Sequence, residues 1–129
     1  MKYLFDTKAL VAFFNGEEGC ERVRELLRDV EGGAAEGYVS AVTLTELYYL
    51  YARRAGAGVA RRRVEQVLLS DLKVIPVDEH VALKAGEFKS RSVPIADALI
   101  AASASIVGAR VVTDDEHFEK LGVEVEKFR

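Results

Sequence analysis

The sequence is poor in the residues that cross-link small proteins or hold zinc. A single cysteine, Cys20, cannot form an internal disulfide and has no cysteine partner for a zinc site. Two histidines, His80 and His117, are too few and too isolated for a histidine-rich metal centre. These scarcities exclude a disulfide scaffold and argue against a zinc centre.

Long apolar runs are missing as well. The longest stretches without charge are too short or too polar to span a membrane. Near the amino terminus, Asp6 interrupts the apolar run that a secretory signal would need, and no small-residue cleavage site follows. We therefore expect a cytoplasmic protein that does not contact a membrane.

What is present indicates one globular domain over residues 1–129. Half of the residues are hydrophobic and 30% are charged, a composition that disordered chains do not have. A chain of this length buries roughly two-thirds of its unfolded surface. The net charge of −3 argues against a surface that binds nucleic acid everywhere, but a local basic patch is compatible with it.

Strand-like and helix-like segments alternate along the chain, as hydrophobic periodicity and turn residues indicate. Strands are expected over 2–6, 38–42, 74–77, 110–113 and 123–128. Helices are expected over 7–14, 17–30, 43–54, 59–71, 79–91, 94–107 and 115–121. The pattern predicts an α/β/α sandwich around a mostly parallel central sheet of four to five strands.

Two features refine this picture. Pro76 favours an irregular or edge position for strand 74–77, and the last strand is also expected at an edge. The helical hairpin over 43–71 is long for one crossover connection, so we expect part of it to stand out from the sandwich.

The helix over 94–107 contains an unexplained charge. Its apolar positions run right round the helix, which predicts burial, and Asp97 is the only charged residue between Ser92 and Ala109. Burying an ionised carboxylate costs several kcal/mol unless it is paired, hydrogen-bonded or bound to a metal. The positive end of the helix offsets at most about 2 kcal/mol. We therefore expect a metal or another functional partner beside Asp97.

Other acids lie where predicted strands end. Asp6 ends the first strand, Glu46 lies in the first turn of the helix after the second, and Asp114 and Asp115 follow the fourth. In open α/β sheets these positions face one crevice. Carboxylates gathered there raise each other's pKa values, and Mg²⁺ or Mn²⁺ relieves that repulsion. An all-carboxylate set points to phosphodiester chemistry.

Each of these acids also has a structural interpretation. Thr43 and Glu46 fit a capping box, with Thr43 as N-cap. Asp6 fits a helix N-cap, and so does one of Asp114 and Asp115. The sequence leaves both interpretations open.

Hydroxyl and basic residues surround this set. Thr7 and Thr113 either cap helices or turns, or donate to phosphate and metal-bound water. Five arginines on the hairpin could bind RNA phosphates, face solvent or contact another protein. Three tyrosines beside them could stack on bases. These residues are Arg53, Arg54, Arg61, Arg62, Arg63, Tyr48, Tyr49 and Tyr51. The apolar helix surface over 44–51 favours a homodimer.

Four pieces, in order along the whole chain, carry a resemblance to a known family. They are YLFDT at 3–7, TEL at 45–47, ADALIAASA at 96–104 and VTDDEHF at 112–118, and the third is the most diagnostic. Together they resemble the PIN-domain family, in particular the small prokaryotic ribonuclease toxins usually called VapC. The resemblance implies a PIN-like fold and a metal-dependent endoribonuclease, often dimeric and inhibited by an antitoxin protein.

The resemblance also implies a site. The family's acidic positions map onto Asp6, Glu46, Asp97 and Asp115, which would hold Mg²⁺ or Mn²⁺ and cleave RNA, with the choice between Asp114 and Asp115 left open. Lys8 departs from the family's usual small polar residue, and we expect it to pair with an acid or to touch phosphate. The family pattern places His117 outside the acidic set, and His80 reads as an ordinary surface or capping residue.

Two other functions compete with this one. A phosphoacceptor receiver domain has a similar length, and Asp78 follows the third predicted strand as a phosphoacceptor would. However, that hypothesis gives Asp97 no role, and the sequence lacks an acidic pair after the first strand. The remaining alternative is a PIN-like domain that binds RNA or protein with its acids idle.

Overall fold

The computed structural model describes residues 1–89 and 92–129. The strands are β1 (Lys2–Phe5), β2 (Glu36–Ser40), β3 (Lys73–Ile75), β4 (Arg110–Thr113) and β5 (Val125–Lys127). The helices are α1 (Thr7–Asn15), α2 (Cys20–Glu31), α3 (Ala41–Ala55), α4 (Ala57–Leu68), α5 (Glu79–Lys89), α6 (Ile95–Val107) and α7 (His117–Lys120). The predicted alternation is confirmed. The last two positions of the helix expected over 79–91 lie outside the described residues.

The strands form one parallel sheet in the order β3-β2-β1-β4-β5. β1 is central, pairing with β2 through Leu4 and Tyr38 and with β4 through Leu4 and Val111. β3 and β5 lie at the edges, as predicted. A receiver domain has the order 2-1-3-4-5. The receiver hypothesis is therefore wrong, and Asp78, which follows an edge strand, accepts the backbone N–H of Val81 in the first turn of α5.

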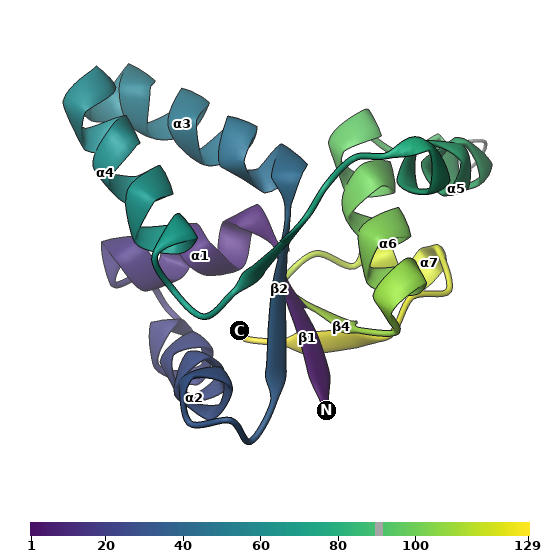
Figure 1. Cartoon of the computed structure of the whole chain (residues 1–129), viewed down its shortest axis with the longest axis horizontal. Coiled ribbons are helices and arrows are strands. Elements are labelled where there is room, and N and C mark those ends of the chain that lie inside the picture. The colour runs from purple at the N-terminus through teal and green to yellow at the C-terminus, as the bar shows by residue number, and fades with distance from the viewer. Residues whose placement is uncertain (90–91) are drawn as a thin grey trace.

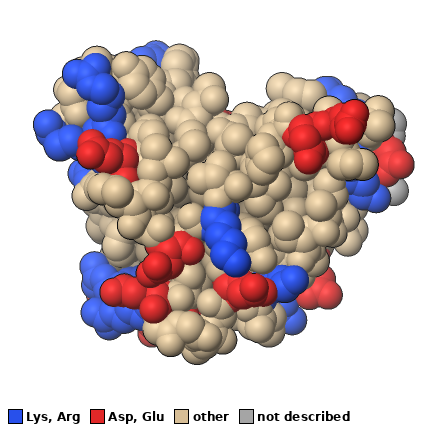
Figure 2. Space-filling model, viewed as in Figure 1, with Lys and Arg blue, Asp and Glu red and all other residues tan. Residues whose placement is uncertain are grey.

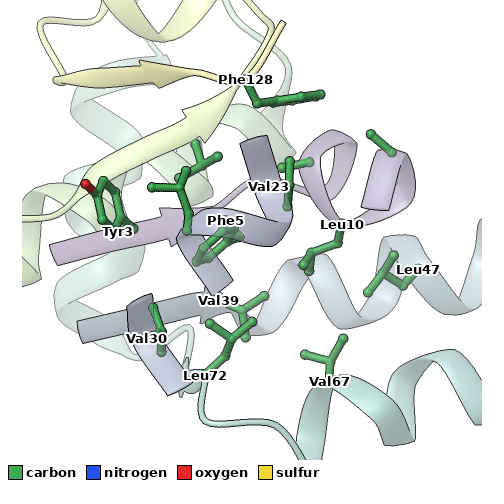
Figure 3. Close-up of a cluster of buried hydrophobic side chains, with 14 of the residues drawn as sticks. Tyr3, Phe5, Leu10, Val23, Val30, Val39, Leu47, Val67, Leu72 and Phe128 are labelled. Carbon is green, nitrogen blue, oxygen red and sulfur yellow. The ribbon is translucent and has the colours of Figure 1, made fainter. Parts of the chain in front are cut away.

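Helices cover both faces of the sheet and bury two apolar clusters (Figure 1). Side chains alternate along β1, so Phe5 packs with Val39 against α1 to α4, as Figure 3 shows, whereas Leu4 packs against α5 and α6. Both side chains are completely buried. In the part of the chain that the structure describes, every helix is too short or too polar to cross a bilayer.

The hairpin of α3 and α4 extends away from the sheet, as its length predicted (Figure 1). Figure 2 shows a notch in the surface between this hairpin and the lobe formed by α5 and α6. Tyr48 and Tyr49 on α3 are exposed, although they are large side chains. An apolar face of α3 is therefore available to solvent.

Candidate active site

The four acids assigned from the sequence come from four different elements and converge at the carboxyl edge of the sheet. Asp6 follows β1, Glu46 lies on α3, Asp97 lies in the first turn of α6, and Asp115 follows β4. Their charges act on one another: Asp97 and Glu46 raise the pKa of Asp6, and Asp115 raises that of Asp97. The topology thus brings the four acids to one edge of the sheet, the carboxyl ends of its parallel strands.

Asp6 is the most deeply buried of the four, with 4% of its surface exposed. One carboxylate oxygen accepts the backbone N–H of Thr7 at 2.7 Å, so Asp6 is also the N-cap of α1. The other oxygen accepts the hydroxyl of Thr113 at 2.8 Å. Burial, reinforced by the charges of Asp97 and Glu46, outweighs both bonds and raises the pKa of Asp6 to about 7.

The capping-box interpretation of Glu46 is wrong. α3 begins at Ala41, and Ser40 is its N-cap, with Oγ accepting the N–H of Val42 at 3.2 Å. This earlier start moves Glu46 out of the first turn. Its Oε1 instead accepts the hydroxyl of Thr7 at 2.6 Å, which orients the carboxylate toward α1.

Thr43 is buried beneath this contact, and its hydroxyl oxygen lies 3.0 Å from that of Thr7. Thr7 therefore joins α1 to α3 at the site, and Thr113 joins β4 to Asp6. Both threonines use their hydroxyls to orient proposed ligands, which is a third role beside the capping and phosphate roles considered from the sequence.

The prediction that α6 is buried all round is only partly right. Ala98, Ile100 and Ala101 are buried, but Ile95 and Ile106 are exposed. The Asp97 side chain retains 21% exposure, because the first turn of α6 lies at the edge of the core. Burial and the charge of Asp115 raise its pKa, while His117 opposes the rise. The acid for which burial is most costly is therefore Asp6 rather than Asp97.

Asp114 and Asp115 point to different neighbours. Asp115 lies beside Lys8, at 3.3 Å from its Nζ, and near Asp97. Asp114 accepts the Nε–H of Arg129 at 2.7 Å. Burial pushes the pKa of Asp115 upward, but the His117 N–H and Lys8 outweigh burial and lower it. The geometry favours Asp115 as the fourth acid.

His117 lies inside the acidic set, contrary to the expectation from the family pattern. Its Nδ1 is 3.3 Å from an oxygen of Asp115 and 3.6 Å from an oxygen of Asp97. The sequence cue to this position of His117 is its spacing of two residues from Asp115, which permits an Asx-type turn. In that turn Asp115 accepts the backbone N–H of His117 at 2.9 Å, and the imidazole lies next to the carboxylate.

The basic residues near the site are fewer than the arginine cluster suggested. Arg63 packs over the rings of Phe14 and Tyr51, which gives it a role in the hairpin core. Arg54 lines a hollow of about 260 Å³ together with Lys8, Asp114 and Arg129. Lys8 and Arg54 thus place positive charge beside the acids, and the expected pairing of Lys8 with an acid is confirmed.

Comparisons with known proteins identify the family and agree with the fold. The model of the PIN domain family matches residues 3–124. A search of curated proteins returns no match.

Solved structures resemble the chain over nearly its whole length. A chain of DNA-bound VapBC from Salmonella typhimurium is 25% identical, with a TM-score of 0.80 and coverage of 100% of this chain and 99% of that one. FitAcB from Neisseria gonorrhoeae is 27% identical, with a TM-score of 0.73 and 95% coverage of each chain. VapC20 from Mycobacterium tuberculosis, a toxin that cleaves the sarcin–ricin loop, is 19% identical, with a TM-score of 0.73 and coverage of 94% and 95%.

Proposed function

The chain belongs to the PIN domain family, and we propose that it is an endoribonuclease dependent on a divalent cation, the toxin of a toxin–antitoxin pair. VapC20, a toxin that cleaves the sarcin–ricin loop, has the same fold and supports a toxin role, and the VapBC and FitAcB neighbours share that fold. Its RNA substrate would be met in the cytoplasm.

One observation carries this proposal: Asp6 is a buried acid next to the acids of α3 and α6, Glu46 and Asp97, and Asp115 lies beside Asp97. The pKa of Asp6 is raised to about 7, because burial and its acidic neighbours disfavour the ionised carboxylate. Bringing such groups together destabilises the folded state unless a ligand compensates their charges. A bound cation reverses the cost by neutralising the set.

The donor set fits Mg²⁺ or Mn²⁺, which take carboxylate oxygens. Asp6, Glu46, Asp97 and Asp115 would hold the ion, and each carboxylate has lone pairs beyond those used by its hydrogen bonds. A divalent cation held there supplies Lewis acidity toward a phosphodiester group and activates water for its hydrolysis.

The remaining residues orient the ligands and the substrate. Thr7 fixes Glu46, and Thr113 fixes Asp6, so neither carboxylate needs to reorient when a ligand arrives. Lys8 and Arg54 line the adjoining hollow, where their positive charges would attract the phosphates flanking the scissile bond. These two residues would position RNA without reading its sequence.

Two protein partners follow from the same proposal. An antitoxin would block the site, as the resemblance to VapC implies. A second copy of the chain would cover the exposed face of α3, where Thr45, Tyr48, Tyr49, Ala52 and Arg53 line an apolar hollow of about 500 Å³.

The test is cleavage of a mixed RNA pool by the purified protein with Mg²⁺, with Mn²⁺ and with a chelator. We expect cleavage with either ion, none with chelator, and a loss of at least about a hundredfold in Asp97→Asn, since ligand and electrostatic groups in active sites contribute on this scale. Asp78→Asn is the matched control, because Asp78 is exposed and lies after the edge strand β3.

Full activity of Asp97→Asn would refute the assigned site. Absence of cleavage under every condition, together with no heat of metal binding in calorimetry, would instead favour the idle RNA-binding or protein-binding domain. Circular dichroism of each variant shows whether it is folded.

A further inference from the structure

We propose that His117 is a ligand of this metal centre and that its imidazole makes the centre favour Mn²⁺ over Mg²⁺. The inference rests on the proposed function, because it adds a nitrogen donor to the cation site of that function. Among the described residues, ligand atoms of Asp97, Asp115 and His117 all lie within 4.8 Å of one another.

The two separations from the His117 nitrogen fall in the range that an ion requires. An octahedral ion with bonds of about 2.1 Å holds neighbouring donor atoms roughly 3 Å apart and opposite ones roughly 4 Å apart. The His117 Nδ1 lies 3.3 Å from Asp115 and 3.6 Å from Asp97, between these two values. With the Asp97 and Asp115 oxygens within 4.8 Å of each other, rotation of these exposed or half-buried side chains would bring all three onto one ion.

The chain around His117 holds the ring in this place. Phe118, the next residue, is completely buried and anchors α7 to the core. On the other side, Asp115 accepts the backbone N–H of His117 and donates its own N–H to the hydroxyl of Thr113. That hydroxyl in turn donates to Asp6, so the imidazole and the buried acid are linked through one short loop. The ring is 49% exposed, which leaves it accessible to an ion from solvent.

The chemistry of the donor decides the preference. Mg²⁺ is a hard ion that takes oxygen ligands, whereas imidazole nitrogen binds first-row transition-metal ions. A site of four carboxylates alone accommodates Mg²⁺ and Mn²⁺ alike. Adding one imidazole stabilises the Mn²⁺ complex and contributes little to the Mg²⁺ complex.

A purely positioning role gives a different result. In that role the His117 Nδ1–H donates to Asp97 or Asp115, orients the carboxylate and never contacts the ion. Losing it would then weaken both ions alike, and no imidazole nitrogen would couple to bound Mn²⁺. The two roles are therefore separable by measurement.

The experiment combines pulsed electron paramagnetic resonance of bound Mn²⁺ with calorimetric titrations of Mn²⁺ and Mg²⁺. In the wild type we expect an imidazole ¹⁴N coupling that is lost in His117→Gln and retained in His80→Gln. The sequence has only these two histidines, and His80 is exposed on α5, so it is a matched control. His117→Gln should weaken Mn²⁺ binding by about tenfold or more, as the loss of metal-site residues does, and Mg²⁺ binding by much less.

A wild type without ¹⁴N coupling, or an equal loss of affinity for both ions in His117→Gln, would overturn the inference. If either result accompanies cation-dependent cleavage that Asp97→Asn abolishes, the proposed function stands and only the role of His117 fails. Failure of the wild type to bind Mn²⁺ or Mg²⁺ at all would overturn both.

Discussion

At the scale of single residues, Asp6 connects stability to function. It caps α1, accepts a hydroxyl from Thr113, and is the acid that burial disfavours most. The sequence located this residue at a strand end, and from that its place at the carboxyl edge of the sheet could be predicted. Its burial could not, because burial depends on α3, α6 and β4, which pack around it only in the folded chain.

The raised pKa of Asp6 predicts a stability that depends on pH in the metal-free protein. Unfolded Asp6 loses its proton near pH 3.8, but folded Asp6 keeps it to about pH 7. Between these values the folded state binds more protons, so the free energy of unfolding falls as pH rises toward 7. The raised pKa of Asp97 also makes the free energy of unfolding fall as pH rises. The lowered pKa of Asp115 makes the free energy of unfolding increase with pH, over a lower pH range.

Asp6→Asn removes the contribution of Asp6 to the pH dependence of the free energy of unfolding. We expect the variant to be more stable than the wild type by a few kcal/mol at pH 8 in chelator, and by much less at pH 5. Urea unfolding at the two pH values measures the difference, with Asp78→Asn as control. Equal stability of the wild type at pH 5 and pH 8 would contradict the raised pKa.

Lys8 gives a second prediction at this scale. Its ammonium lies 3.3 Å from Asp115 and 3.9 Å from Asp114, so it competes with a cation for the charge of the set. Lys8→Met should therefore strengthen Mg²⁺ binding several-fold in calorimetry at low salt. Lys2→Met, at the opposite end of β1, is the control. Unchanged or weaker Mg²⁺ binding in Lys8→Met would show that the ammonium does not compete.

At the scale of elements, the start of α3 could not be predicted from the local sequence alone. Ser40 and Thr43 are both good N-cap residues, and Thr43 also has Glu46 three positions later. The structure uses Ser40, because Thr43 and Glu46 are held by Thr7 of α1 instead. The competing partner lies 36 residues away from Thr43 in the sequence, so no local rule includes it.

Ser40 as the N-cap of α3 predicts how variants at Ser40 and Glu46 change the free energy of unfolding. Ser40→Ala should lower the free energy of unfolding by about 1 kcal/mol, the usual value of an N-cap. Glu46→Gln should leave it unchanged or raise it, because that variant removes a charge that repels Asp6. Chemical denaturation of both variants in chelator measures these changes. Unchanged stability of Ser40→Ala would contradict Ser40 as the N-cap, and a loss in Glu46→Gln as large as that in Ser40→Ala would contradict the repulsion of Asp6 by Glu46.

At the scale of the whole molecule, the fold was the most predictable property. Alternating strands and helices predicted the sandwich, and the edge position of β3 is one of the two that Pro76 favoured. That the acids lie near one another was predictable from their positions at strand ends, but the geometry around them was not. His117 is an example, since its distances to Asp97 and Asp115 depend on how α6 and α7 pack together.

The exposed face of α3 predicts self-association. Tyr49→Glu places a charge in the apolar hollow of this face, so we expect it to convert a dimer into a monomer. Sedimentation velocity at micromolar concentration measures the mass, with Leu83→Glu, at an exposed position on α5, as control. A monomeric wild type, or a dimer in Tyr49→Glu, would contradict a homodimer formed through this face.

The central position of β1 has a consequence for the way the protein is made. Asp6 is translated among the first residues, yet its partner Thr113 lies 107 positions later, and so does the contact of Lys8 with Asp115. Chains are synthesised from the amino terminus, and contacts that close such long loops form late in folding. A nascent chain would therefore carry no assembled site until residues 113–115 have been synthesised and have folded onto β1.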